Sequence, residues 1–246
     1  GGSGNDSLFY VDDTGSISNS LFQSGSGNNS FSVTAQGFDV STIQGGSGND
    51  SLSLTATDES SKASLQGADG NDSITVTGDL AESFVAGGDN NDTITLVGAL
   101  DSTSVYGGSG NDTIIATVGA NDAKDSLFKD STGNNSFEIT ATSTLDSLTV
   151  NGGDGSDSIT LTAASKNSYI TAGGEDDEVT VTGAIDDSTI YLGSGDDVVD
   201  LNGAVTDVLI QSGSGDNSYD ILGNADATLN GGTGADSLLV TGTLGG

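Results

Sequence analysis

The segment that decides the fold is Gly45-Gly-Ser-Gly-Asn-Asp-Ser-Leu52, because close copies of it recur along the whole chain. One copy, Gly1–Leu8, opens the sequence, and the spacing between copies is 19 to 23 residues. Twelve copies start at residues 1, 24, 45, 67, 87, 107, 130, 152, 172, 192, 212 and 231. A recurring period of this length indicates a repeat architecture in which each copy is one structural unit. The copies leave no room for a separate domain, so we expect one continuous array without a cap over residues 1–246.

Each copy carries the pattern of a half-buried strand. With the first residue of the copy as position 1, positions 8 and 10 are apolar in all twelve copies, as in Ile74 and Val76. Positions 7, 9 and 11 are mostly Ser or Thr, and this alternation predicts a strand. An apolar residue two places before each following copy, such as Val85, predicts a second strand. We therefore predict an all-β fold, a two-sided parallel β-solenoid (β-roll) of about 12 rungs with a Gly-rich turn on one edge.

The composition excludes several classes of function. The 246 residues include 36 Asp and Glu against four Lys and Arg, for a formal net charge of −32, and they include no His, Cys, Met, Trp or Pro. Nucleic acid is a poor partner for such a chain, because phosphate binding needs clustered positive charge. Without His or Cys the commonest general base and any thiol nucleophile are absent, and no cleft of paired carboxylates is recognisable, so we expect no enzyme. No apolar run approaches the ~18 residues of a membrane span.

The Gly-rich turn is the candidate site. Gly lets the turn direct its carbonyl groups inward, and the acidic residue at position 6 supplies a hard oxygen directly before the strand. Stacked turns place these oxygens in one column, where like charges about 4.8 Å apart repel unless a cation lies between them. Ca²⁺ accepts a mixture of carboxylate and carbonyl oxygens in tolerant geometry. The column therefore predicts a calcium ladder along one edge, with about one Ca²⁺ per gap between rungs.

The segments Gly1–Leu8, Gly45–Leu52 and Gly107–Ile114 resemble the G-G-x-G-x-D-x-U-x repeat of the RTX (repeats-in-toxin) family, a calcium-binding β-helix motif. The resemblance covers the whole chain, although the family carries the motif on both edges and this chain on one. It implies calcium between successive turns, held by position-6 side chains: Asp6, Asp50, Asp72, Asp92, Asp112, Asp157, Asp177, Asp197 and Asp236, with Asn29, Asn135 and Asn217 in the other rungs. It also implies backbone carbonyl ligands from Gly2, Gly4, Gly46, Gly48, Gly108, Gly110, Gly153 and Gly155. Turns 130–135 and 172–177 depart from the pattern, and calcium binding there stays open.

The function that we expect is structural: an extracellular or cell-surface calcium-binding rod, such as a fibre, an adhesin stalk or a surface layer. The absence of Met, at position 1 too, predicts a processed product or a segment of something longer. Open first and last rungs predict that copies of the chain stack end to end into a filament. The alternative is an ice-binding or glycan-binding RTX adhesin module. Asn at position 5 of the first seven copies favours ice binding, and exposed aromatic residues such as Phe84 and Tyr169 favour glycan binding.

Overall fold

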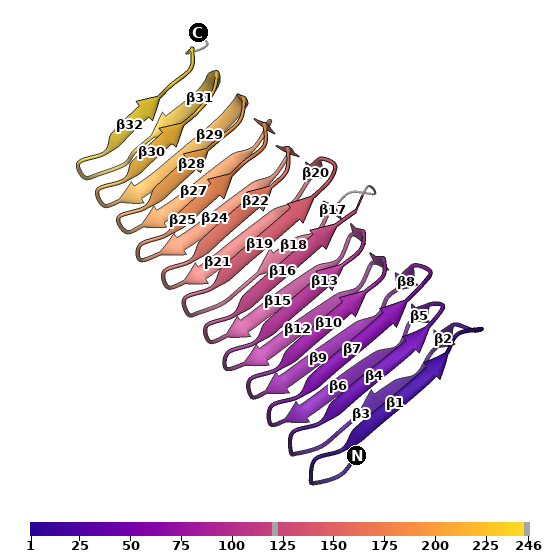
Figure 1. Cartoon of the computed structure of the whole chain (residues 1–246). Helices are drawn as coiled ribbons and strands as arrows, with labels where there is room; N and C mark the ends of the chain where they lie inside the picture. Colours follow the sequence, from indigo (N-terminus) through magenta and orange to yellow (C-terminus); the bar gives the residue numbers. More distant parts are fainter. Residues whose placement is uncertain (120–122, 244–246) are drawn as a thin grey trace.

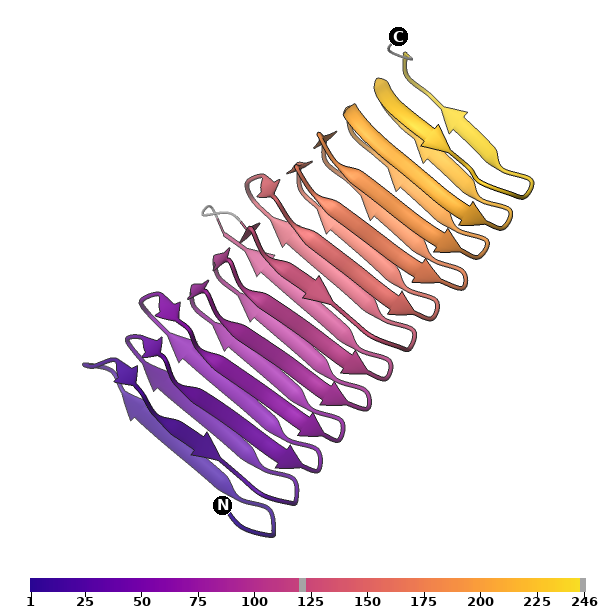
Figure 2. The same ribbon diagram turned by 180° about the vertical axis from the view of Figure 1, so that it is seen from behind.

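The computed structural model describes residues 1–119 and 123–243, and this part of the chain is all-β, with no helix. Its strands run parallel in successive turns of a β-solenoid of about 12 rungs, which confirms the predicted fold. The rungs stack in chain order from the N-terminal to the C-terminal end, as Figure 1 and the view from behind in Figure 2 show. The predicted array also included residues 120–122 and 244–246, which lie outside the described residues.

The strand that follows each Gly-rich turn belongs to one sheet of 12 parallel strands. Equivalent residues of neighbouring rungs pair, so that Phe31 lies beside Leu52 and Leu52 beside Ile74. The strands of this sheet are β1 (Ser7–Asp12), β4 (Ser30–Ala35), β7 (Ser51–Ala56), β10 (Ser73–Thr77), β13 (Thr93–Val97), β16 (Thr113–Val118), β19 (Ser136–Ala141), β22 (Ser158–Thr162), β25 (Glu178–Val181), β28 (Val198–Leu201), β30 (Ser218–Ile221) and β32 (Ser237–Val240).

The chain returns through a second sheet, which has 18 strands. Its main strands are β3 (Leu21–Gln23), β6 (Thr42–Ser47), β9 (Ser64–Asp69), β12 (Phe84–Asp89), β15 (Ser104–Ser109), β18 (Leu127–Lys129), β21 (Thr149–Asp154), β24 (Tyr169–Gly174), β27 (Thr189–Ser194), β29 (Val205–Ser214) and β31 (Ala225–Asn230). Two-residue strands precede most of them: β8 (Ser60–Ser61), β11 (Leu80–Ala81), β14 (Leu100–Asp101), β17 (Ala123–Lys124), β20 (Leu145–Asp146), β23 (Ser165–Lys166) and β26 (Ile185–Asp186). A further pair of short strands, β2 (Ile17–Ser18) and β5 (Phe38–Asp39), forms a separate small sheet.

The core is a set of apolar columns between the two sheets. Leu52 and Leu54 of β7 and Leu65 of β9 are fully buried, and their equivalents in the next rungs lie directly beside them. Burial of one such side chain stabilises the fold by about 1.5–3 kcal/mol, but a single rung buries only a few side chains. The stack is therefore stable only as a whole, since each rung depends on its neighbours for a continuous core.

On the edge opposite the Gly-rich turns, the bend in each of the first ten rungs contains a residue with a left-handed backbone conformation. Val40, Glu82 and Ser102 all have φ near +50°. The next residue is in most of these rungs a buried Ser or Thr. Ser83, for example, accepts the N–H of Ala63 at 3.0 Å and donates its hydroxyl to the Ala81 carbonyl at 2.8 Å. This bond explains why the chain places small hydroxyl residues at this point.

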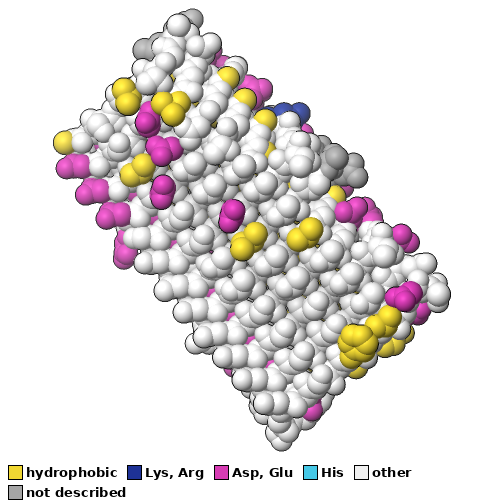
Figure 3. Space-filling model, viewed as in Figure 1, with side chains coloured by type: hydrophobic (Ala, Val, Ile, Leu, Met, Phe, Trp, Pro, Cys, Tyr) yellow, Lys and Arg dark blue, Asp and Glu magenta, His cyan; other side chains and the backbone are white. Residues whose placement is uncertain are grey.

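The outer face of the first sheet carries few charged or hydrophobic side chains, as the space-filling view shows (Figure 3). Thr75 and Thr95 lie beside one another on this face, whereas Glu138 stands between Ile115 and Thr160. The outer surface is therefore polar but not regular from end to end.

Candidate metal centre

The residues at position 6 form a continuous buried column along the Gly-rich edge. From Asn29 in rung 2 to Asn217 in rung 11, none of them is more than 3% exposed. One side-chain oxygen, Oδ1, accepts the backbone N–H of position 6 in the preceding rung, as Asp92 does from Asp72 at 2.7 Å. The bonds of this kind run unbroken from Asp6 to Asp236 at 2.6 to 3.1 Å. Each rung is therefore tied to the next through a position-6 side chain.

The other carboxylate oxygen of the column, Oδ2, is buried and accepts no hydrogen bond. On this edge of the described chain this holds for Asp50, Asp72, Asp92, Asp112, Asp157, Asp177 and Asp197, and also for Asp130. One further atom of this kind, Asp220 Oδ1, belongs to β30 and lies outside the column. A buried polar atom without a partner is costly, and each such atom in a folded protein requires an explanation.

Burial raises the pKa of these carboxyl groups. The pKa of Asp72 is raised to about 7, and that of Asp92 to about 8, chiefly because burial penalises the charged form. The neighbouring carboxylates Asp112 and Asp72 raise the pKa of Asp92 further. The column therefore favours a bound positive charge, either a proton or a cation, beside each Oδ2.

The three Asn rungs show which groups face this second atom. The side-chain nitrogen of Asn29 donates to the carbonyl of Gly27 at 2.7 Å and to that of Gly45 at 3.3 Å. Asn135 donates to Gly133 at 2.9 Å and to Gly152 at 3.3 Å in the same way. These carbonyl groups belong to position 4 of the same rung and position 1 of the following rung. We call the position-6 side chain and these two carbonyl groups the turn site.

The amide orientation in the Asn rungs is fixed by the hydrogen-bond network. Asn29 Oδ1 must face the Asp6 N–H, which needs an acceptor, so that Nδ2 faces the two carbonyl oxygens, which need a donor. The structure therefore places the oxygen of each Asn in the rung-to-rung hydrogen bond and its nitrogen in the turn site.

In an Asp rung the turn site brings together oxygen atoms only. A β-carbon on Gly67 would lie within 2.6 Å of both Asp72 Oδ2 and the Gly87 carbonyl oxygen, and one on Gly152 would lie within 2.6 Å of Asp157 Oδ2 and the Ala172 carbonyl oxygen. Gly at position 1 thus leaves these oxygens free to converge. A carboxylate facing carbonyl oxygens fits a hard cation, and Ca²⁺ binds such mixed oxygen sets.

The structure places the predicted position-6 side chains from Asn29 to Asn217 in the buried column. Asp6 in the first rung is half-buried and accepts the Ser24 hydroxyl at 3.4 Å, while Asp236 in the last described rung is exposed. The position-2 carbonyl groups of Gly2 and Gly108 accept the N–H of the next rung, from Ser26 and Ser131 at 3.1 Å. In the Asn rungs the carbonyl groups that face position 6 are those of position 4 and position 1. Gly4, Gly48, Gly110 and Gly155 occupy position 4 of other rungs, and their role as ligands stays a prediction; the position-1 carbonyl was not predicted.

The two irregular turns differ from one another. Rung 7 has Asp130 at position 1, and this side chain is buried beside Asp112, a contact that sequence reasoning missed. The one available indication was an acidic residue in a column that is mostly Gly. In rung 9, Glu175 adopts a left-handed conformation with φ 71°, and Asp177 still lies buried in the column.

A second ladder of side chains follows the outside of the same edge. Asn28 N–H is accepted by Asn5 Oδ1 at 2.8 Å, and Asn49 N–H by Asn28 Oδ1 at 3.0 Å. The pattern continues to Ser156, and Asp176, Asp196 and Asp216 repeat it farther along. The Asn residues at position 5 therefore have a structural role in stacking the turns.

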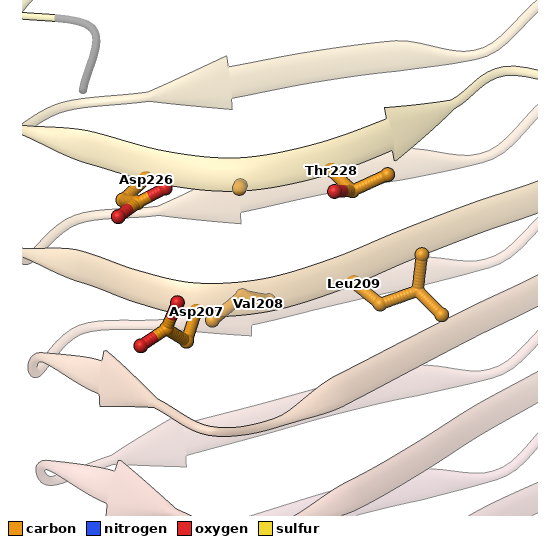
Figure 4. Close-up of a pocket in the computed structure, with 6 residues that line it drawn as sticks. Asp207, Val208, Leu209, Asp226 and Thr228 are labelled. Carbon is orange, nitrogen blue, oxygen red and sulfur yellow. The ribbon is translucent and has the colours of Figure 1, made fainter. Parts of the chain in front are cut away.

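No other part of the described chain offers a comparable site. Residues 1–119 and 123–243 contain no cluster of three or more acidic side chains that could hold a metal. A groove between β29 and β31 is lined by Asp207, Val208, Leu209, Asp226, Ala227 and Thr228 (Figure 4). Its two carboxylates come from adjacent rungs. The described residues include no helix with the length and hydropathy that a membrane span needs.

Comparisons with known proteins return no match: no family model, no curated protein and no solved structure matches this chain.

Proposed function

We propose that this chain is a structural, extracellular β-roll of the RTX type, a rod whose Gly-rich edge binds Ca²⁺ between successive rungs. The observation that carries the proposal is the column of buried Oδ2 atoms without a hydrogen-bond partner, which runs along this edge in rungs 3–6 and 8–10. Each of these atoms occupies the place that an amide nitrogen takes in the Asn rungs.

The number of proposed ions is lower than one per gap. Seven turn sites combine a buried unpartnered carboxylate with a following rung: those of Asp50, Asp72, Asp92, Asp112, Asp157, Asp177 and Asp197. The Asn rungs need no ion, since their amide groups already donate to the carbonyl oxygens, and we leave Asn29, Asn135 and Asn217 out of the proposed ligand set. Seven Ca²⁺ ions contribute +14 to a chain of formal net charge −32. The remaining negative charge favours solubility.

Calcium suits these sites better than magnesium. Carbonyl and carboxylate ligands fixed by a β-ladder cannot close into the tight octahedron that Mg²⁺ demands, whereas Ca²⁺ accepts 6–8 oxygens at about 2.3–2.6 Å with irregular angles. The resemblance to RTX repeats suits a chain that folds on reaching extracellular calcium. The role of the chain's own residues is to hold the turns in register and to present the carboxylates.

A structural role follows from the uniformity of the rungs. The turn site recurs along the edge, so the bound ions would brace the whole stack and not a single cleft. The strands at the two ends, β1 and β32, each pair on one side only within the described residues. Unpaired strand edges are templates for pairing, and copies of the isolated chain are therefore proposed to stack end to end.

The ice-binding and glycan-binding alternatives gain no specific support. Each Oδ1 in the position-5 column from Asn5 to Asn134 is already occupied by the N–H of the next rung. The outward aromatic pairs, Phe84 with Tyr106 and Tyr169 with Tyr191, pack on one another at ring distances of 5.4 and 5.5 Å.

The calcium requirement is tested by circular dichroism of the purified chain with calcium, with excess EGTA, and with EGTA plus magnesium. Because metal-binding free energy is folding free energy when the site forms only on folding, the β-sheet spectrum should be lost in EGTA, return with Ca²⁺, and return poorly with Mg²⁺. A full β-sheet spectrum in EGTA would refute the requirement. Light scattering at increasing protein concentration in calcium tests the stacking: a chain that stays monomeric would refute the filament.

A further inference from the structure

One turn of the column carries a second buried carboxylate. In the other rungs position 1 is Gly or another uncharged residue, but in rung 7 it is Asp130, whose side chain is 1% exposed. Its Oδ1 accepts the backbone N–H of Ser131 at 2.7 Å and that of Gly108 at 3.2 Å. These two bonds tie Asp130 to its own rung and to rung 6, and they fix the direction of the carboxylate.

The remaining oxygen of Asp130 points into the turn site of rung 6. A β-carbon on Gly107 would lie within 2.7 Å of both Asp130 Oδ2 and Asp112 Oδ2. Both oxygens are buried and accept no hydrogen bond, and Asp112 is 2% exposed. Two unpartnered carboxylate oxygens from adjacent rungs therefore converge on one point, which occurs at no other described turn.

We propose that Asp112 and Asp130 together form a two-carboxylate calcium site, distinct from the repeated turn sites and the tightest in the column. The inference rests on the proposed function, because it takes the turn sites to bind Ca²⁺. Elsewhere a turn site offers one carboxylate, so that a bound Ca²⁺ keeps an excess positive charge. Here two carboxylates neutralise the ion completely, and calcium affinity rises with the number of charged ligands.

The position of this site gives it a role in the stack. It joins rungs 6 and 7 next to residues 123–129, where the repeat is 23 residues long rather than 20. Rung 7 itself carries Asn135, whose amide closes the following turn site without an ion. The tight ion would therefore hold the centre of the rod together at calcium concentrations that leave the other sites partly filled.

The alternative occupant is a shared proton, which would join the two carboxyl groups as an acid pair. The two occupants differ in a measurable way, because only the cation site loses a bound ion when Asp130 is changed. Asp130→Asn keeps the shape of the side chain, and Asp130→Gly installs the residue found at position 1 in rungs 3 to 6. Asp154→Asn is the matched control: it removes one charge from the same edge one rung away, at an exposed side chain.

The experiment measures calcium bound per chain by equilibrium dialysis against a series of buffered free Ca²⁺ concentrations, followed by atomic emission. The wild-type chain should hold one ion more tightly than the rest. Both Asp130 variants should lose that tight ion, with an affinity at least about 10-fold weaker, since even changes outside the ligand sphere cost roughly 10–100-fold. Asp154→Asn should keep it.

Two results would overturn the inference while leaving the proposed function intact. The first is a set of equivalent ions in the wild type. The second is a tight ion that stays unchanged in both Asp130 variants. If Asp130→Asn is then also more stable than the wild type in EGTA, the two carboxyl groups share a proton. A wild-type chain that binds no calcium would overturn the proposed function itself and this site with it.

Discussion

Asp92→Asn installs in rung 5 the amide that the chain already uses in rungs 2, 7 and 11. Asp92 is 2% exposed, its Oδ1 accepts the Asp72 N–H at 2.7 Å, and its Oδ2 has no partner. The introduced amide oxygen can keep the bond to Asp72, and its nitrogen can reach the carbonyl groups of positions 4 and 1, as Asn29 does at 2.7 and 3.3 Å. The change therefore removes a charge without disturbing the ladder.

The predicted effect changes sign with calcium. Without calcium, the introduced amide gains two hydrogen bonds of about 1 kcal/mol each and relieves a buried unpartnered oxygen that costs about 1–3 kcal/mol, so that the unfolding free energy should rise by about 3–5 kcal/mol. With calcium, the wild-type site contributes about 2.7 kcal/mol at 100 times its dissociation constant and about 4.1 kcal/mol at 1,000 times. The two chains should therefore become equally stable at a calcium concentration between about 100 and about 5,000 times the dissociation constant, and the wild type should be more stable beyond it.

The assay is urea denaturation followed by circular dichroism over a series of buffered Ca²⁺ concentrations. The stability curves of wild type and Asp92→Asn should cross, and the variant should bind one calcium ion fewer. Because the wild type is expected to unfold in EGTA, the readout at low calcium is the free calcium concentration at the folding midpoint, and the variant should fold at lower calcium. A variant that is less stable at every calcium concentration would refute the idea that the amide replaces the ion.

Three further predictions concern other residues. Asn135→Asp makes the reverse change. The variant should bind one more calcium ion, measured by dialysis, and need more calcium to fold, measured by circular dichroism. An unchanged calcium concentration at the folding midpoint would contradict the proposed role of the amide. Val40→Asn should raise the unfolding free energy by about 1 kcal/mol in thermal or urea melts, because an exposed β-branched residue with φ 48° is strained where Asn is tolerated. A lower stability of the variant would show that the Val40 side chain makes a stabilising contact that outweighs this strain. In EGTA the chain should become more stable as the pH falls from about 8 towards 4. Burial raises the pKa of Asp92 and Asp177 to about 8 from the usual 3.8, so the folded state binds protons that the unfolded state releases, and that stabilisation is lost as the pH rises through the higher pKa. Circular dichroism in EGTA that shows no gain of β-sheet signal as the pH falls over this range would contradict it.

The repeat pattern predicts the fold because it determines which residues of successive copies lie side by side when the strands pair. Positions 8 and 10 must face the core if successive copies stack in register, and Leu52 and Ile74 do pair and are buried. The left-handed bend at Val40 and its equivalents was not predicted, since residues as different as Val, Lys, Glu and Ser occupy it and its conformation is set by stacking on the neighbouring rung.

The candidate site was predicted in part for a similar reason. The spacing places Asp92 and its equivalents in one column, but it does not say which oxygen faces the preceding rung and which faces the turn. That distinction depends on the N–H of Asp72 and on the carbonyl of position 1, neither of which has a residue-type signature. Asp130 was missed because the direction of a side chain at position 1 depends on the backbone conformation of the turn, which the repeat pattern does not specify.

The most direct test of the calcium ladder is the number of calcium ions bound at saturation by the folded chain, measured by isothermal titration calorimetry and checked by atomic emission after dialysis. We expect seven ions, one for each buried carboxylate of the column that faces a following rung, with none in the three Asn rungs. Ten ions would show that the three Asn rungs bind calcium as well, and eleven would add the turn of Asp6. A folded chain that binds none would contradict the central claim, and protons would then occupy the column.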